Sequence, residues 1–280
     1  MILERKDVRL SYFVAGSGQP VTLLHGFTQS GQSWREIIAR MPEGWKWIVP
    51  DLRGHGETRV RTGAPCSMEA CTDDLVALWE EMDLGRTHLV GYSMGGRLAL
   101  HVAARRPERV ASLLTVGAHA GLEEEAREGR RRGDEALAER IEKEGVESFV
   151  EYWGALPLFA GLQRRGDSYM AQVRAERLKN HAGGLACSLR GMGAGVMEPV
   201  WGELGRVKVP CTFVAGQLDH GYVATARRLA GTVRDGRLEI VARAGHAVHQ
   251  ERPDAFARIL ANHLAAATAA GVSSSSSTFD

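Results

Sequence analysis

The sequence has no run of 18 or more apolar residues, and its start, MILERKDVRL, lacks the long apolar stretch of a signal peptide. A helix that crosses a bilayer needs about 20 mostly apolar residues. We therefore expect a cytoplasmic protein with no membrane partner. The net charge is only +1 at pH 7, so the chain as a whole has no field that would attract nucleic acid. Any attraction to an anion must be local.

Cysteine is also scarce, with four residues at positions 66, 71, 187 and 211. They form no CxxC pair, and no histidine lies at metal-ligand spacing from them, so the sequence predicts no metal site. In a cytoplasmic protein we expect these thiols to be reduced. The last segment, residues 268–280, is polar and of low complexity, and we expect a flexible tail there.

Short apolar or β-branched runs recur along the chain, at 21–27, 45–52, 87–93, 111–118, 211–216 and 237–245. Continuous apolar character is typical of strands that are covered on both faces, as in a parallel sheet. Helical patterns lie between several of them, at 67–84, 94–107, 223–233 and 253–267. This alternation predicts an α/β fold, a mostly parallel sheet flanked by helices and joined by right-handed crossovers.

Residues 122–201 differ, because they are charge-rich, helical in pattern and without a convincing strand. We expect a helical lid here, inserted between a first part of the α/β core at 1–121 and a second part at 202–267. This insertion would lie over the carboxyl ends of the strands, where open α/β sheets bind ligands.

The pentapeptide Gly91-Tyr92-Ser93-Met94-Gly95 fits the pattern G-x-S-x-G, with an apolar strand before it and a helical pattern after it. Residues without Cβ let strand and helix approach closely around a strained nucleophile. The turn also places Ser93 at a helix amino terminus, which stabilises developing negative charge. We predict Ser93 as the nucleophile of an α/β-hydrolase fold.

Serine needs an imidazole to take its proton and, usually, a carboxylate to orient that imidazole. Asp219 and His246 each follow a predicted strand, in the order Ser, Asp, His that this fold requires. Competing groups lie nearby, namely His220, His249, Asp235 and Glu239. For both competing histidines we expect a surface or capping role.

The sequence His25-Gly26-Phe27 follows the first apolar strand. In this fold the oxyanion is bound by an N–H from that loop and by the N–H after the nucleophile, which predicts Phe27 and Met94 as the donors. We expect His25 to brace the loop and count it among the residues near the substrate. For Asp51 and His55, in DLRGHG, we predict structural roles.

The chain resembles the 2-succinyl-6-hydroxy-2,4-cyclohexadiene-1-carboxylate synthases of menaquinone biosynthesis over nearly all of its length up to about residue 265. The resemblance rests on LLHGFTQSGQSW, PDLRGHGET, LVGYSMGGRLAL, GAHAGL followed by Arg127-x-x-Arg130-x-x-x-Asp134, FVEYWGALPLFA, AGQLD and RAGHAVHQERP. It implies a carbon–oxygen lyase that eliminates pyruvate from 2-succinyl-5-enolpyruvyl-6-hydroxy-3-cyclohexene-1-carboxylate without an acyl-enzyme. Ser93, activated by His246, would then abstract a ring proton, and no cofactor is implied.

Such a substrate carries several carboxylates, and arginine pairs with carboxylates through two parallel hydrogen bonds. By motif match, the family's anion-binding arginines fall on Arg97, Arg130 and Arg177, and its pocket aromatics fall on Tyr92 and Trp153. Arg127 is a further candidate contact or a structural residue. Because residues 130, 131 and 132 are all arginine, the match of the lid arginine to the family motif could shift by one position.

Two other functions are compatible with the sequence. A serine hydrolase acting on an ester or a carbon–carbon bond would use the same triad with a covalent intermediate, although an arginine-poor, apolar lid would suit it better. A binding module on this fold would have no reason to keep Ser93, Asp219 and His246 together. The sequence leaves the oligomeric state open between a monomer and a small homo-oligomer.

Overall fold

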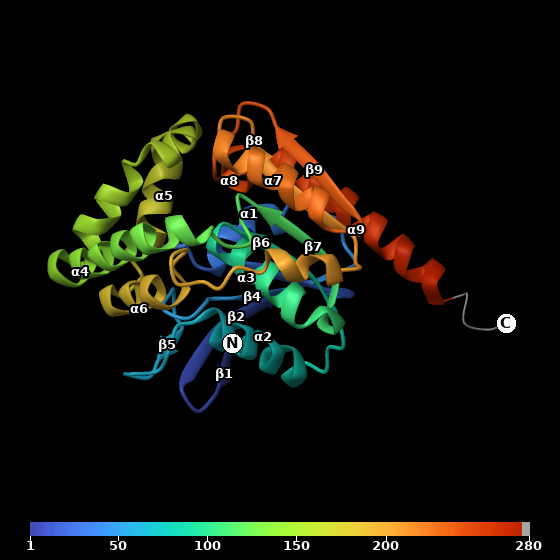
Figure 1. The fold of residues 1–280 in the computed structure, drawn as a ribbon, viewed down its shortest axis with the longest axis horizontal. Helices are drawn as coiled ribbons and strands as arrows, with labels where there is room; N and C mark the ends of the chain where they lie inside the picture. The colour runs from blue at the N-terminus through green and yellow to red at the C-terminus, as the bar shows by residue number, and fades with distance from the viewer. Residues whose placement is uncertain (276–280) are drawn as a thin grey trace.

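The computed structural model describes residues 1–275 and contains a nine-stranded sheet in the order β1-β2-β4-β3-β6-β7-β8-β9, with β5 paired to β2 (Figure 1). The strands are β1 (Ile2–Glu4), β2 (Val8–Ala15), β3 (Gln19–Leu24), β4 (Trp45–Pro50), β5 (Arg59–Val60), β6 (Thr87–Tyr92), β7 (Val110–Val116), β8 (Cys211–Gly216) and β9 (Gly236–Val241). The six strands from β3 and β4 through β6, β7, β8 and β9 pair in parallel, which confirms the predicted fold class.

The amino-terminal strands β1, β2 and β5 pair antiparallel, and the sequence analysis did not predict them. In the first half of β2, Val8, Leu10 and Tyr12 are buried while the residues between them are more exposed. This alternation is typical of a strand at the margin of a sheet, with one face toward water. Its period-2 pattern differs from the continuous apolar runs on which the prediction relied.

Helices cover both faces of the sheet. On one face pack α2 (Met68–Glu81), α3 (Met94–Arg105) and α7 (His220–Thr232), whose Leu75, Leu98 and Leu229 share one core cluster. On the other face lie α1 (Arg35–Ile38), α8 (Val248–Glu251) and α9 (Pro253–Ser275), with Phe256 and Leu260 in a second cluster. Short 3₁₀ segments complete the connections, at η1 (Gly31–Trp34), η2 (Pro107–Arg109), η3 (Pro157–Arg165) and η4 (Trp201–Arg206).

The segment between β7 and β8 is a helical insertion, as expected. It contains α4 (Glu124–Gly154), α5 (Asp167–Arg177) and α6 (Ala182–Met192), which stand together beside the core in Figure 1. Helices α4 and α6 pack against each other through a small core of their own, which includes Ile141, Phe149 and Leu185. Gly145, with φ 82°, kinks α4 and lets its second half turn back along the insertion.

Helix α9 continues to Ser275, so residues 268–275 of the expected tail are helical. The alanines of AAATAA have the highest helix propensity of any residue and extend the helix beyond the part that packs on the core. The rest of the predicted tail, 276–280, lies outside the described residues. Over the described part of the chain, no helix is both long and apolar enough to cross a membrane.

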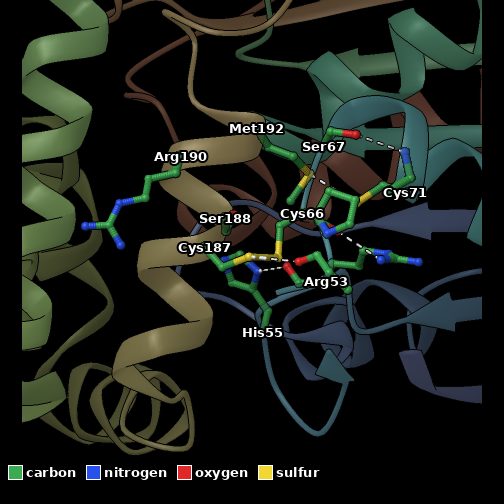
Figure 2. Close-up of a disulfide and its surroundings, with 12 residues drawn as sticks. Arg53, His55, Cys66, Ser67, Cys71, Cys187, Ser188, Arg190 and Met192 are labelled. Carbon is green, nitrogen blue, oxygen red and sulfur yellow. Dashed lines mark hydrogen bonds between the residues drawn. A yellow bond between two sulfur atoms is a disulfide. The ribbon is translucent and has the colours of Figure 1, made fainter. Parts of the chain in front are cut away.

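The expectation of four reduced thiols is wrong for two of them. Cys66 and Cys187 form a disulfide with a Cα–Cα distance of 5.7 Å, whereas Cys71 and Cys211 are free and buried. Figure 2 shows the bond between α6 of the insertion and the segment that leads into α2. The two positions are 121 residues apart, and pairing at that separation depends on the tertiary structure, so spacing in the sequence gave no signal.

Candidate active site

Ser93 lies at the junction between β6 and α3, with φ 50° and ψ −110°. Its backbone N–H donates to the carbonyl of Val116 on the neighbouring strand, which holds this strained conformation in place. A Cβ atom on Gly91 would meet the carbonyl of Gly95, and one on Gly95 would meet the carbonyl of Leu24. The predicted reason for both glycines, close approach of strand and helix, is therefore confirmed.

Ser93, His246 and Asp219 come together as a hydrogen-bonded chain. His246 Nε2 lies 3.0 Å from Ser93 Oγ, and His246 Nδ1 lies 2.7 Å from Asp219 Oδ2. Asp219 immediately precedes α7, and His246 lies in the loop between β9 and α8. The carboxylate accepts the Nδ1 proton and so leaves Nε2 as the acceptor that faces the serine. This geometry is suited to removing a proton from Ser93.

A cavity of about 140 Å³ opens beside this triad. Residues from both the core and the insertion line it, namely Phe27, Tyr92, Ser93, Met94, Arg97, His119, Arg130, Trp153, Leu158, Phe159, Ser188, Leu189, Met192, Gly193, Ala194, Tyr222 and His246. The insertion thus forms part of the wall of the site. The two expected oxyanion donors, Phe27 and Met94, both line the cavity next to Ser93.

Arg97 brings a buried positive charge to this cavity. Its Nη1 donates to the carbonyl of Met192, 2.6 Å away, and the residue is 9% exposed. Burial lowers the pKa of Arg97 to about 10, because a charged guanidinium loses solvation there. At pH 7 the group is still protonated. It is therefore a fixed cation one helical turn from Ser93.

Arg130 also lines the cavity, while its Nε donates to Asp134 Oδ1 at 2.8 Å. The next two arginines pair with Glu128 on the outside of α4, so the structure selects position 130 among the three. Arg127 does not line the cavity. It pairs with Glu124 and Glu198, at 3.0 and 2.8 Å, and these ion pairs favour the structural one of its two predicted roles.

Arg177 is 3% exposed and lies over the ring of Phe159, with 4.9 Å between the guanidinium carbon and the ring centroid. Its Nε and Nη2 atoms are buried without a hydrogen-bond partner in the structure. Burial lowers the pKa of this arginine. Arg177 borders a larger neighbouring groove of about 330 Å³ rather than the catalytic cavity, from which Phe159 separates it. Tyr92 and Trp153 lie in the cavity itself, as expected.

His25 is fully buried and does not line the cavity. Its Nε2 accepts a hydrogen bond from the Leu52 N–H at 2.9 Å, and its Nδ1 lies 2.9 Å from the Gly26 carbonyl. The residue braces the loop, as expected, and its burial away from the cavity does not support a direct contact with substrate. Asp51 accepts hydrogen bonds from the N–H groups of Gly31 and Glu57, which confirms its structural role.

His249, one of the competing histidines, is buried instead of lying at the surface. Its ring packs between Trp34 and Tyr92, with centroid distances of 4.7 and 4.4 Å, and both ring nitrogens lack partners. Burial lowers the pKa of His249 to about 3, so the ring is neutral at pH 7. It has no contact with the Ser93 hydroxyl and packs as an aromatic core residue. His220 is exposed at the start of α7, as expected.

Three polar residues of the cavity were not predicted from the sequence, Ser188 and, closer to the charged groups, His119 and Tyr222. His119 Nδ1 accepts from the Gly121 N–H at 3.1 Å, and burial together with the Arg97 and Arg130 charges lowers the His119 pKa to about 3. The Tyr222 ring lies 4.7 Å from that of His246. The motif GAHAGL and the position three residues after Asp219 were the signals available for them. Across residues 1–275, no cluster of three or more His, Cys, Asp or Glu side chains is arranged to hold a metal ion.

Comparison with known proteins agrees with this fold and site. The family model of the alpha/beta hydrolase fold matches residues 19–253. A Bacillus subtilis (strain 168) protein assigned as a 2-succinyl-6-hydroxy-2,4-cyclohexadiene-1-carboxylate synthase is 37% identical over 90% of this chain and 94% of its own length. The structure of MenH from S. aureus has a TM-score of 0.87 at 28% identity and covers 92% of this chain and 98% of that one.

A second solved structure belongs to an enzyme of a different class. A thermophilic esterase from Thermogutta terrifontis, with malate bound, has a TM-score of 0.81 at 28% identity and covers 93% of this chain and 94% of that one. Similarity of fold alone therefore does not choose between a hydrolase and a lyase. The sequence match over nearly the whole length is narrower, and by it the chain belongs to the 2-succinyl-6-hydroxy-2,4-cyclohexadiene-1-carboxylate synthase family of the α/β-hydrolase fold.

Proposed function

We propose that this chain is a lyase that eliminates pyruvate from 2-succinyl-5-enolpyruvyl-6-hydroxy-3-cyclohexene-1-carboxylate and yields 2-succinyl-6-hydroxy-2,4-cyclohexadiene-1-carboxylate for menaquinone biosynthesis. The name of the Bacillus subtilis relative, 37% identical to this chain, supports the product. A cytoplasmic location, and a state no larger than a small homo-oligomer, are part of the proposal. The substrate is a small polycarboxylate, and the charges of the cavity are the principal support for that choice.

The observation that carries the proposal is the excess of guanidinium charge around Ser93. Arg97 and Arg130 line the cavity, and Arg177 lies directly behind its Phe159 wall. Within residues 1–275, the only acidic partner of Arg130 is one oxygen of Asp134, and the bond from Arg97 goes to a neutral carbonyl. Arg97 and Arg177 are buried, and a buried guanidinium is costly unless an anion compensates it. A substrate with several carboxylates provides that compensation.

The triad has the geometry for base catalysis. Asp219 holds the His246 ring with Nε2 toward Ser93, 3.0 Å away, so the imidazole can take the hydroxyl proton. The serine oxygen then removes a ring proton of the substrate. The electron pair moves into an enolate-like system as the carbon–oxygen bond to the enolpyruvyl group breaks, and the departing group becomes pyruvate after it gains a proton. The N–H groups of Phe27 and Met94 would bind the oxygen on which charge develops.

Incubation of the purified chain with the enolpyruvyl substrate tests the proposal. We expect release of one pyruvate per substrate consumed, measured with lactate dehydrogenase as the coupling enzyme. We also expect the cyclohexadiene chromophore to appear. A Ser93→Ala variant prepared in the same way is the control for a contaminating activity. Rapid turnover of nitrophenyl esters without pyruvate formation would overturn the lyase proposal and favour the serine hydrolase.

A further inference from the structure

The Cys66–Cys187 disulfide joins the α/β core to the helical insertion (Figure 2). Cys66 directly precedes Ser67, whose side chain caps α2 by accepting from the Ala70 N–H. Cys187 lies in the middle of α6. The bond therefore ties the start of a core helix to a helix of the insertion, at a point where the two are otherwise separate parts of the chain.

Helix α6 is one of the parts of the insertion that line the Ser93 cavity, together with residues of α4 and η3. Ser188, next to Cys187 in the chain, lines the cavity together with Leu189 and Met192. The carbonyl of Met192, at the end of the same helix, accepts the hydrogen bond from Arg97. A shift of α6 would move this acceptor and one wall of the cavity together, because a helix moves as a rigid unit.

Close backbone contacts also seat α6 on the core. A Cβ atom on Gly191 would meet the carbonyl of Cys66, and a Cβ atom on Gly184 would meet the carbonyl of Gly54. These contacts flank the disulfide along the helix. They keep α6 near its place when the bond is broken, but van der Waals contacts at these glycines do not prevent sliding as a covalent bond does.

We propose that the Cys66–Cys187 disulfide is a positioning element of the active site, which holds α6 so that the Met192 carbonyl orients Arg97, and that thiol reductants weaken substrate binding by breaking it. The role of Arg97 in binding rests on the proposed function. A dithiol supplies the two electrons and two protons: the sulfur–sulfur bond breaks, both cysteines become thiols, and the dithiol becomes a cyclic disulfide.

The surroundings of the bond allow this exchange at one sulfur. Cys187 is partly exposed and borders a surface groove of about 360 Å³, whereas Cys66 is buried. An external thiolate can therefore approach the Cys187 sulfur. The two free cysteines do not compete in the exchange, because burial raises the pKa of the Cys71 and Cys211 thiols to about 12 and keeps them protonated.

The first experiment compares the oxidised full-length protein with the same protein after treatment with dithiothreitol, with free thiols counted by mass spectrometry after alkylation. We expect two free thiols before reduction and four after it. We also expect the KM for the enolpyruvyl substrate to rise by about tenfold, less than the hundredfold that a 1 Å misplacement can cause, with kcat nearly unchanged. Four free thiols in the protein purified without reductant would overturn the proposal.

Two variants separate positioning from general stabilisation. Cys66→Ser/Cys187→Ser should have the raised KM without reductant and show no further response to it. Cys211→Ser is the matched control, since a serine there can keep the hydrogen bond to the Val209 carbonyl and the disulfide is left intact. It should respond to dithiothreitol as the natural sequence does. A lowered melting temperature with an unchanged KM in the double variant would show that the disulfide only stabilises the fold. That result would overturn the proposal.

Hydrogen exchange gives a measurement that does not depend on the identity of the substrate. Reduction should speed amide exchange in α6, residues 182–192, at least severalfold while exchange in α3 stays constant. If no form of the protein releases pyruvate, the proposed function fails, and the exchange data still test the positioning of α6. Equal α6 exchange in the oxidised and reduced protein would contradict the inference whatever the substrate is.

Discussion

Arg97 Nη1 donates to the carbonyl oxygen of Met192 across a distance of 2.6 Å, and this bond links α3 of the core to the last residue of α6. It orients a buried guanidinium on the same helix that begins directly after Ser93. The other side of that guanidinium faces the cavity, where it has no carboxylate partner in the structure. The bond therefore places a fixed cation beside the triad without neutralising it.

Replacement of this guanidinium should impair substrate binding. Arg97→Ala removes a hydrogen bond to a charged group, worth about 1.5–3 kcal/mol, so we expect kcat/KM to fall by about 10- to 100-fold, mostly through KM. Steady-state pyruvate release measures both constants. Arg127→Ala, which breaks ion pairs outside the cavity, is the matched control and should leave them unchanged. Unaltered kinetics in Arg97→Ala would refute the anion-pocket argument.

The Ser93 hydroxyl should matter for turnover much more than for binding. We expect Ser93→Ala to lower kcat by about 10²–10⁴-fold, the range for loss of a positioned proton-transfer group. The arginines remain in this variant, so the substrate Kd from calorimetry should stay close to that of the natural sequence. Loss of binding in a correctly folded Ser93→Ala protein would mean that the serine contributes mainly to recognition.

His249 should be replaceable by an aromatic residue. Its two ring nitrogens are buried without partners between Trp34 and Tyr92, and an apolar ring removes that penalty. We expect His249→Phe to change the free energy of unfolding, measured with urea, by less than about 1 kcal/mol. Pyruvate release should persist, whereas His246→Phe should abolish it. An inactive but folded His249→Phe would show that the assignment of the base is incomplete.

The pH dependence of stability should reflect a buried histidine pair. His88 Nδ1 and His263 Nε2 both lie 2.8 Å from Ser112 Oγ, and burial lowers their pKa values to about 4 and about 3. Below pH 6.5 the unfolded chain binds protons that the folded chain does not. The free energy of unfolding should therefore fall as pH drops from about 6.5 to about 4, by up to 1.4 kcal/mol per pH unit for each such histidine.

Urea unfolding at several pH values between 7 and 4.5 measures this slope. Carboxylates contribute in the same direction at the acidic end, so a variant is needed to isolate one histidine. His263→Asn should reduce the slope of the unfolding free energy against pH, near pH 5.5, by about the contribution of one proton. The reason is that asparagine does not titrate. An identical slope in the variant and the natural sequence would show that the His263 pKa is not depressed by folding.

Several parts of this site follow from local sequence. The turn around Ser93 needs Gly91 and Gly95 for reasons that involve adjacent backbone, and the order of Ser93, Asp219 and His246 follows from which strands end in parallel at one edge of the sheet. Arg97 shares a helix with the nucleophile, so its spacing alone placed it near the cavity. The amino-terminal strands β1 and β2 were missed because β1 has only three residues and the alternating pattern of β2 is weaker than a buried apolar run.

Other features depend on contacts between distant segments, and only the tertiary structure decided them. Periodicity along α4 does not tell which of three adjacent arginines faces the core, since that depends on how the helix lies against α6. The burial of His249 depends on Trp34 and Tyr92, from two other parts of the chain. The pairing of Cys66 with Cys187 requires α6 to meet the segment before α2 across 121 positions, and no local pattern specifies that distance.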